Sequence, residues 1–325
     1  MSKPKWGLLA VSKIARKFAL ELVSQGISIQ AVASRDPVKA ENFSREFNIP
    51  KSYGSYEALL ADPEIDVVYI SLPNQLHVEW CLRAAQAGKH ILCEKPLCPT
   101  AADCEKIVEA VNRAKVFFLE GFAYRFHPLY GQIRDRIRNG ALGQIRLIQL
   151  ARSFDMGLNL TNIRHSQEAM GGALMDVGCY SLSLCRFLLG EEPVEFQTMA
   201  HRGSVTGVDE WTACQTGFPS GAIASFQCAT RVAQPHFARI FGEKGLLEID
   251  APWYPDKSAA TARILRGGEV HETLQAGDGL SLFAREALQV EKHLAEGQCP
   301  EMNWSDSLGQ ALAMEKLRNS AKWVG

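Results

Sequence analysis

Apolar strand-like runs alternate with helical segments in the first 122 residues, and this alternation is the feature that most constrains the fold. The runs cover residues 6–11, 27–34, 65–72, 90–94 and 116–122. Each is continuously rather than alternately hydrophobic, which is typical of strands buried on both faces. Strands separated by helices pair in parallel through right-handed crossovers. We therefore predict a doubly wound α/β domain with a parallel sheet over residues 1–122.

Polar and small residues mark where the helices of this domain begin and end. Asp36 before Pro37 has the pattern of an N-cap followed by the first helical residue. Thr100 with Asp103 has the spacing of a capping box. Gly88 follows an apolar helical segment and is typical of a C-terminal cap. These signals support the alternation of strands and helices.

Strand-like runs follow one another closely after an amphipathic helix at 127–140. They cover residues 145–154, 194–203, 210–219, 221–231, 238–249 and 261–268, and residues 218–221 have the composition of a hairpin turn. Strands without helices between them indicate an antiparallel sheet. Further helices are expected near 171–188, 281–296 and 305–322. We predict that residues 123–325 form an α+β domain with a largely antiparallel open sheet, and that the last helix can pack back on the first domain.

The composition is that of an ordinary globular protein. Of the 325 residues, 46% are hydrophobic and 22% are charged, and the formal net charge of -1 argues against nucleic-acid binding. No apolar run approaches the roughly 18 residues of a membrane span, and the apolar stretch near the start is too short for a signal peptide. We predict a cytoplasmic protein.

Nine cysteines are scattered between Cys81 and Cys299. They include no Cys-x-x-Cys pair and have no histidine-rich partner. We therefore expect reduced thiols rather than disulfides, and we predict no metal site.

The turn after the first strand stands where a dinucleotide-binding protein carries Gly-x-Gly-x-x-Gly, yet its residues read AVSKIA. Ala10 and Ser12 replace the first two glycines, whereas alanine is accepted at the third position. A phosphate site of this kind consists mainly of main-chain N–H groups at a helix N-terminus, which need no glycine side chain. Two interpretations stay open. The turn is either a plain strand, turn and helix, or a cofactor site formed by Ala10, Ser12, Lys13 and Ile14.

The end of the second strand bears on the choice of cofactor. An NAD enzyme places Asp or Glu there, on the ribose 2′-hydroxyl, but this chain has Ser34 and Arg35. A guanidinium pairs with a 2′-phosphate, whereas a carboxylate would repel it. Asp36 is acidic and close by, although its place before Pro37 suits a helix cap. This pattern favours NADP over NAD.

Five motifs occur along the chain in a fixed order. They are WGLLAVSKIA at 6–15, PNQLH at 73–77, AGKHILCEKPL at 87–97, GFAYRFHP at 121–128 and GGALMDVGCY at 171–180. In these motifs the chain resembles the glucose-fructose oxidoreductase / inositol dehydrogenase / rhizopine catabolism (Gfo/Idh/MocA) family. The segments NIR at 162–164 and GVDE at 207–210, with the tyrosine that ends DVGCY, resemble its dimeric dihydrodiol dehydrogenase and NADP-dependent D-xylose dehydrogenase branch.

The resemblance implies a Rossmann domain and a catalytic set of Lys95, Asp176 and Tyr180. A hydride leaving an alcohol needs a base for the hydroxyl proton, and a tyrosine serves when a nearby cation such as Lys95 stabilises its phenolate. Asp176 lies four residues before Tyr180, on the same helix face, where it can orient a second substrate hydroxyl. The alternatives are a core tyrosine, a helix-capping aspartate and a surface lysine.

The same resemblance extends the site to residues on several loops. The expected cofactor contacts are Leu72, Asn74, His77, Glu94 and Lys95, and the expected substrate contacts are Tyr124, Arg125, Asn162 and Arg164. Packing at a domain interface is the alternative for Tyr124 and Arg125, and helix capping is the alternative for His77.

We interpret the chain as an NADP-dependent oxidoreductase. It would move a hydride between the nicotinamide and a secondary alcohol or hemiacetal carbon of a sugar or cyclic diol. The alternatives are a glucose-fructose type oxidoreductase with a retained cofactor and a non-catalytic NADP-binding regulator. Because one face of the antiparallel sheet lacks cover from its own domain, we expect a homodimer through that sheet.

Overall fold

The computed structural model describes residues 3–324, which divide into two compact units. The first unit extends to Phe126 and also contains Leu280–Leu308. The second unit contains His127–Gly279 and the residues from Gly309 onward. The boundary expected between residues 122 and 123 stays a prediction.

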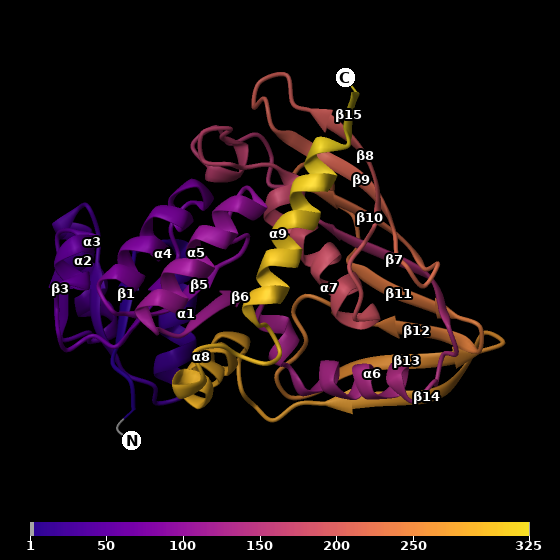
Figure 1. Cartoon of the computed structure of the whole chain (residues 1–325), viewed down its shortest axis with the longest axis horizontal. Helices are drawn as coiled ribbons and strands as arrows, with labels where there is room; N and C mark the ends of the chain where they lie inside the picture. Colours follow the sequence, from indigo (N-terminus) through magenta and orange to yellow (C-terminus); the bar gives the residue numbers. More distant parts are fainter. Residues whose placement is uncertain (1–2, 325) are drawn as a thin grey trace. The chain divides into compact units, whose positions relative to one another are not determined.

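The first unit contains a six-stranded parallel sheet in the order β3-β2-β1-β4-β5-β6, of which β3, β1, β5 and β6 are labelled in Figure 1. Its strands are β1 (Trp6–Leu9), β2 (Ile29–Ala33), β3 (Lys51–Tyr53), β4 (Val67–Ile70), β5 (His90–Glu94) and β6 (Phe118–Gly121). All residues of β1, β4 and β6 are buried, as their continuous hydrophobicity requires. The predicted doubly wound domain is confirmed. β3 was missed because it has three residues, none of them fully buried.

Helices connect these strands, and two of them begin at the predicted caps. They are α1 (Lys13–Ser24), α2 (Pro37–Phe47), α3 (Tyr56–Leu60), α4 (His77–Gln86) and α5 (Ala101–Ala114), and α8 (Leu282–His293) joins them from far along the chain. The Asp36 carboxylate accepts main-chain N–H bonds at the start of α2, and the Thr100 hydroxyl does so at the start of α5. Phe283 of α8 packs its ring 5.7 Å from that of Phe18 on α1.

The second unit contains a nine-stranded sheet in the order β14-β13-β12-β11-β7-β10-β9-β8-β15. Its strands are β7 (Ile145–Ser153), β8 (Glu195–Arg202), β9 (Asp209–Gly217), β10 (Ile223–Ala229), β11 (Phe237–Gly242), β12 (Gly245–Ile249), β13 (Ala260–Arg266), β14 (Glu269–Ala276) and β15 (Ala321–Val324). Neighbours are antiparallel except that β7 pairs with β10, and β8 with β15, in parallel. The largely antiparallel sheet is therefore confirmed.

Three expectations for this sheet were incomplete. The run 238–249 forms two strands, β11 and β12, because the chain reverses between Gly242 and Gly245. β14 was missed because it is an edge strand with mostly exposed residues, and β15 because it follows directly on a helix. The predicted hairpin turn at 218–221 is confirmed by antiparallel pairing of β9 with β10.

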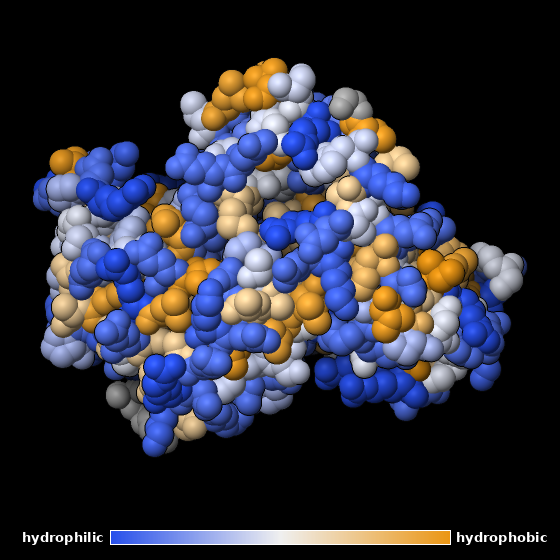
Figure 2. All heavy atoms as spheres, turned by 45° about the horizontal axis from the view of Figure 1, so that its top comes forward, coloured by the Kyte–Doolittle hydropathy of each residue, from blue (hydrophilic) through white to orange (hydrophobic). Residues whose placement is uncertain are grey.

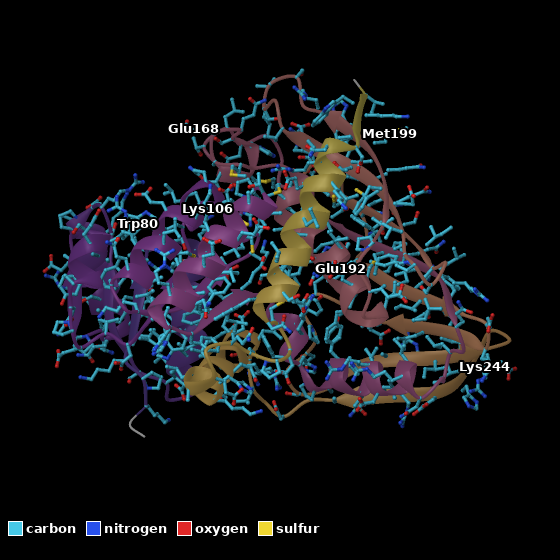
Figure 3. The ribbon with its side chains drawn as sticks, viewed as in Figure 1. Trp80, Lys106, Glu168, Glu192, Met199 and Lys244 are labelled. Carbon is cyan, nitrogen blue, oxygen red and sulfur yellow. The ribbon has the colours of Figure 1, made fainter. Side chains whose placement is uncertain are left out.

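Helices α6 (Pro128–Arg138), α7 (Cys179–Leu189) and the later part of α9 (Trp304–Asn319) lie on one side of this sheet (Figure 1). Strand residues on the opposite side alternate with buried ones. Among them are Leu147, Met199, Trp211 and Ile223, of which Met199 lies on β8 (Figure 3). They leave apolar side chains on the uncovered face.

Within residues 3–324, no helix has both the length and the apolar character needed to cross a membrane. On the face drawn in Figure 2, hydrophobic residues lie in small groups among hydrophilic ones. The cytoplasmic location stays a prediction.

Candidate active site

The turn between β1 and α1 keeps the conformation for which a glycine is normally needed. Ala10 has φ of 122°, a region that residues with a Cβ rarely adopt. Ser12 caps α1, its Oγ accepting from the N–H of Ala15 at 3.1 Å and lying 3.2 Å from Oγ of Ser71. The N–H groups of Lys13 and Ile14 lie in the first turn of α1, where helix geometry provides no internal acceptor. The turn therefore has the elements of an anion site although the glycines are absent.

Two oppositely charged residues, Arg35 and Asp36, follow β2 and have different surroundings. Ser34 is buried and its Oγ accepts from the N–H of Asp36 at 3.1 Å. The Asp36 carboxylate accepts from the N–H groups of Val38 and Lys39. Its negative charge therefore interacts with the N-terminus of α2. Arg35 is exposed at the end of the strand. This arrangement leaves a guanidinium, rather than a carboxylate, where the ribose of a dinucleotide would be recognised.

His77 links the loops that follow β4 and β5. Its ring is buried, with Nδ1 2.9 Å from the carbonyl oxygen of Pro96 and Nε2 2.8 Å from that of Leu72. Burial lowers the pKa of His77, and a neutral ring can donate to one of the two carbonyls. His77 is also the first residue of α4. Its contact with a cofactor stays a prediction.

Hydrogen bonds from other strands hold the segment that carries the Glu-Lys-Pro motif. The hydroxyl of Tyr69 donates to Oε1 of Glu94 at 2.6 Å, at the carboxyl end of β5. Lys95 is half-buried, and Asn74 begins a short 3₁₀ turn in the neighbouring loop. Glu120, which sequence reasoning missed, accepts from the N–H of Leu97 at 3.1 Å. Burial raises the pKa of Glu120 to about 7, so this carboxyl is only partly ionised near pH 7.

Tyr124 and Arg125 are buried within the first unit. The ring of Tyr124 lies edge-on to that of Phe122, with the centroids 6.4 Å apart. The guanidinium of Arg125 forms an ion pair with Asp306 and donates to the carbonyl of Glu301. These contacts are those of residues that pack and pair within the first unit. The predicted contact of Tyr124 and Arg125 with substrate stays a prediction.

In the second unit, the predicted residues Asn162, Arg164 and Asp176 lie together. Oδ1 of Asn162 accepts from the N–H of Arg164 at 3.0 Å. Nε of Arg164 donates to Oδ2 of Asp176 at 2.5 Å. Asp176 lies in a π-helical turn, Leu174–Gly178, that leads directly into α7, whose second residue is Tyr180. Such π turns are frequent at functional sites.

A second arginine, absent from the predicted site, lies against Tyr180. Arg152 projects from β7, is 4% exposed, and has its Cζ 3.3 Å from the centre of the Tyr180 ring. Its Nη2 donates to the hydroxyl of Tyr254 at 2.8 Å. Burial disfavours the charged guanidinium, but neighbouring Tyr180, Tyr254, Cys179 and Asp176 raise the pKa of Arg152. Tyr180 therefore lies against a desolvated cation. An arginine at the end of the predicted strand run 145–154 was the signal that could have identified it.

Asp209, the first residue of β9, is hydrogen-bonded to the start of the π turn. Its Oδ2 accepts from the N–H of Leu174 at 2.6 Å and from the hydroxyl of Thr212 at 2.8 Å. Gly172 has φ of 110°, and a Cβ there would lie 2.0 Å from Oδ1 of Asp209, so a glycine is required. Burial raises the pKa of Asp209 to about 6.

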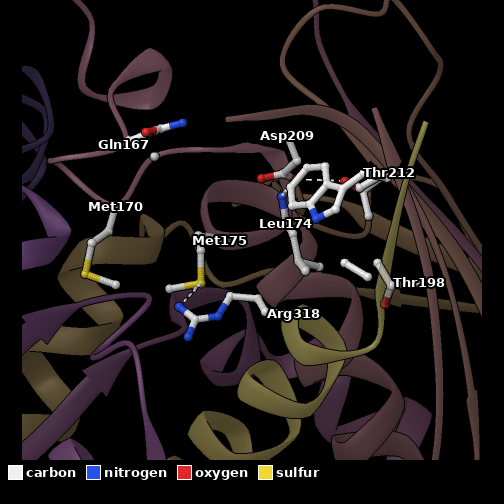
Figure 4. Close-up of a pocket in the computed structure, with 12 residues that line it drawn as sticks. Gln167, Met170, Leu174, Met175, Thr198, Asp209, Thr212 and Arg318 are labelled. Atoms are coloured by element: carbon white, nitrogen blue, oxygen red, sulfur yellow. Dashed lines mark hydrogen bonds between the residues drawn. The ribbon is translucent and has the colours of Figure 1, made fainter. Parts of the chain in front are cut away.

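Asp209 also lines a pocket of about 250 Å³ between the π turn, the sheet and the end of α9 (Figure 4). Arg318 points into it, with its Nη1 4.0 Å from the sulfur of Met175. Asp176, Tyr180 and Arg152 are not among the residues that line this pocket. This pocket therefore does not coincide with the Arg152, Asp176 and Tyr180 side chains.

Comparison with known proteins bears on both units. Residues 5–122 match the model described as an oxidoreductase family with NAD-binding Rossmann fold, and residues 130–248 match the GFO/IDH/MocA C-terminal domain. The trans-1,2-dihydrobenzene-1,2-diol dehydrogenase of Xenopus tropicalis is 32% identical over 324 residues, which cover 96% of each chain. The D-xylose 1-dehydrogenase (NADP(+)) 2 of Haloferax volcanii is 30% identical over 98% of this chain and 97% of its own.

Among solved structures, the aldose-aldose oxidoreductase of Caulobacter crescentus matches with a TM-score of 0.88 at 28% identity. The match covers 98% of this chain and 97% of that protein. Together these matches confirm the resemblance found in the sequence motifs.

The strained turn makes a prediction about stability. Ala10→Gly should raise the free energy of unfolding by about 1 kcal/mol, because release from a disfavoured φ outweighs the entropy cost of glycine. Thermal or urea unfolding of the two proteins measures the difference. Ala31→Gly is the control, since Ala31 is buried in β2 at an ordinary φ and its replacement should destabilise. A loss of stability in both variants would contradict a strained Ala10.

Proposed function

We propose that this chain, which belongs to the Gfo/Idh/MocA family of oxidoreductases, moves a hydride between NADP and an alcohol or hemiacetal carbon of a sugar or cyclic diol. The relatives above are named as dehydrogenases of a dihydrodiol and of D-xylose. The observation that carries the proposal is a phenol, Tyr180, stacked on the buried cation of Arg152, beside the Arg164–Asp176 ion pair. A dehydrogenase needs such a group to transfer the hydroxyl proton.

The first unit fits a dinucleotide on the evidence of its own residues. The N–H groups at the start of α1 would hold the pyrophosphate, through the main chain of Ala10, Ser12, Lys13 and Ile14. Ser34 and Arg35 would hold the 2′-phosphate of NADP. The nicotinamide half would be held by Leu72, Asn74, His77, Glu94 and Lys95. NADP, when bound, supplies or accepts the hydride.

The proton is handled by Tyr180 in this proposal. A tyrosine donates its proton to an alkoxide or accepts one from an alcohol, and a cation against the ring stabilises the phenolate form. Arg152 is already in place for this, and the family resemblance adds Lys95 to the proposed catalytic set. Lys95 would also hold the nicotinamide ribose.

Asp176 and Arg164 orient the substrate. The 2.5 Å ion pair leaves a carboxylate that can accept from a second substrate hydroxyl, while Asn162 holds the turn that carries Arg164. A substrate with two neighbouring hydroxyls, such as a sugar or a cyclic diol, would use both Tyr180 and Asp176.

A second candidate is oxidoreduction between two sugars with a retained cofactor. The structural similarity to an aldose-aldose oxidoreductase favours it. Turnover that needs added NADP and one sugar would support the dehydrogenase. Turnover that needs no added cofactor but requires a second sugar would support the alternative. A regulator would bind NADP without turnover in either assay.

The cofactor proposal predicts a selective loss. Arg35→Ala should weaken NADP binding by about 1.5–3 kcal/mol, the scale of hydrogen bonds to a charged group, and leave NAD binding nearly unchanged. Titration of each cofactor, followed by fluorescence or calorimetry, measures both affinities. Lys39→Ala removes an exposed cation from the following helix and serves as the control. Equal losses for both cofactors in Arg35→Ala would remove Arg35 from the 2′-phosphate.

The catalytic proposal predicts that Tyr180→Phe lowers turnover by about 10²–10⁴-fold, because the ring and its packing remain while the exchangeable proton is lost. NADP affinity should change little. Tyr254→Phe is the matched control. It also removes a hydroxyl beside Arg152. It should lower turnover by less than about tenfold, the scale of one hydrogen bond.

Lys95→Met extends this test, because it should impair turnover and NADP binding together. If Tyr180→Phe kept near-normal turnover, Tyr180 would be a packing residue. The proton would then be handled by Asp176, His165 or another group.

The uncovered face of the second sheet supports a homodimer. Leu147, Trp211 and Ile223 are 46%, 40% and 50% exposed on that face, and burial against a second copy would remove them from water. Sedimentation should give a mass of two 35.9 kDa chains, and Ile223→Glu should shift it toward the monomer. A monomeric wild-type protein at micromolar concentration would overturn this part of the proposal.

A further inference from the structure

Three side chains from the end of α8 and the segment after it converge within the first unit. A ring nitrogen of His293, the sulfur of Cys299 and a carboxylate oxygen of Glu301 all lie within 4.8 Å of one another. His293 and Cys299 are buried, and Glu301 is half-buried. Sγ of Cys299 is 3.2 Å from Oε2 of Glu301. One nitrogen, one sulfur and one oxygen donor thus lie close together, two of them on buried side chains.

The ring of His293 is held in a particular orientation. Its Nδ1 is 2.8 Å from Oε2 of Glu296, a residue outside the group of three. Its Nε2 is buried and has no hydrogen-bond partner among residues 3–324. A carboxylate on Nδ1 keeps the proton there and leaves the lone pair of Nε2 available. Histidines that ligate metals are commonly oriented by an outer carboxylate in this way.

We propose that His293, Cys299 and Glu301 form a binding site for a divalent transition metal, with Zn²⁺ as the best fit. Imidazole, thiolate and carboxylate are its usual ligands, and the two anionic groups match the charge of the ion. The thiol proton of Cys299 leaves to solvent as the Zn–S bond forms. Water or the side-chain oxygen of Gln289, which is 4.0 Å from Sγ of Cys299, can complete a tetrahedron.

The site would be structural. Gln298 pairs with Phe118, the first residue of β6, and the N–H of Phe118 donates to the carbonyl of Gly297 at 3.1 Å. His293 ends α8, so an ion bound here would tie that helix to the segment that lies along the sheet edge. None of the proposed cofactor or substrate residues belongs to this cluster.

The sequence did not suggest this site, and we predicted no metal. The three ligands are separated by five residues and then by one, which matches no common metal motif. Their convergence depends on the tight turn at Gly297, which has φ of 78°, and on the pairing of Cys299 with Met302.

The test uses the full chain, stripped with a chelator and titrated with Zn²⁺ and with Co²⁺. We expect one ion per chain, a thiolate-to-cobalt charge-transfer band in the near ultraviolet, and a melting temperature that rises with Zn²⁺. Cys299→Ser should abolish the band. Glu296→Gln, which removes the outer carboxylate, should weaken the affinity by about 10–100-fold.

Cys104→Ser is the matched control, because Cys104 is equally buried in the same unit but lies on α5. It should keep the cobalt band. Absence of stoichiometric binding to the wild-type chain would overturn the proposal, as would a band that persists in Cys299→Ser. Both outcomes are independent of the oxidoreductase assay, so failure here leaves the proposed function standing.

Discussion

The contact between Arg152 and Tyr180 is the constraint on which the arrangement of the polar residues in the second unit depends. A guanidinium that is 4% exposed is costly to bury unless its charge is compensated. Compensation comes from the Tyr180 ring at 3.3 Å, the Tyr254 hydroxyl at 2.8 Å and nearby Asp176. Arg152 projects from β7, which has a strand on either side of it in the nine-stranded sheet. Tyr180 is therefore held against a cation before any substrate arrives.

The remaining groups of this unit are arranged around that contact by the π turn. The turn carries Asp176 toward Arg164, and its own start is held by the carboxylate of Asp209. Gly172 makes the close approach of Asp209 possible, since any Cβ would occupy the place of a carboxylate oxygen. The polar residues thus hold one another in place, which favours a preorganised site over a mobile one.

The first unit has the elements of an anion site without the usual glycines. Ala10 adopts the backbone conformation of the missing first glycine, and Ser12 caps the helix whose N-terminus faces the turn. The Asp36 carboxylate is hydrogen-bonded to main-chain N–H groups at the start of α2. Arg35 is then the other charged side chain that follows β2. A turn that lacks the first two glycines of Gly-x-Gly-x-x-Gly can therefore still attract a phosphate, because main-chain N–H groups and the helix N-terminus provide the positive charge.

The sequence by itself determined the α/β and α+β architecture, the helix caps at Asp36 and Thr100, and the candidates Lys95, Asp176 and Tyr180. Hydrophobic periodicity, capping and ordered motifs are local signals, so one sequence carries them. Tertiary structure decided the edge strands β3, β14 and β15, and the conformation of Ala10. It also decided that Arg152 stacks on Tyr180 and that His293, Cys299 and Glu301 converge. These depend on contacts between segments far apart in the chain or on tight turns, and sheet pairing and burial set such contacts rather than local residue preference.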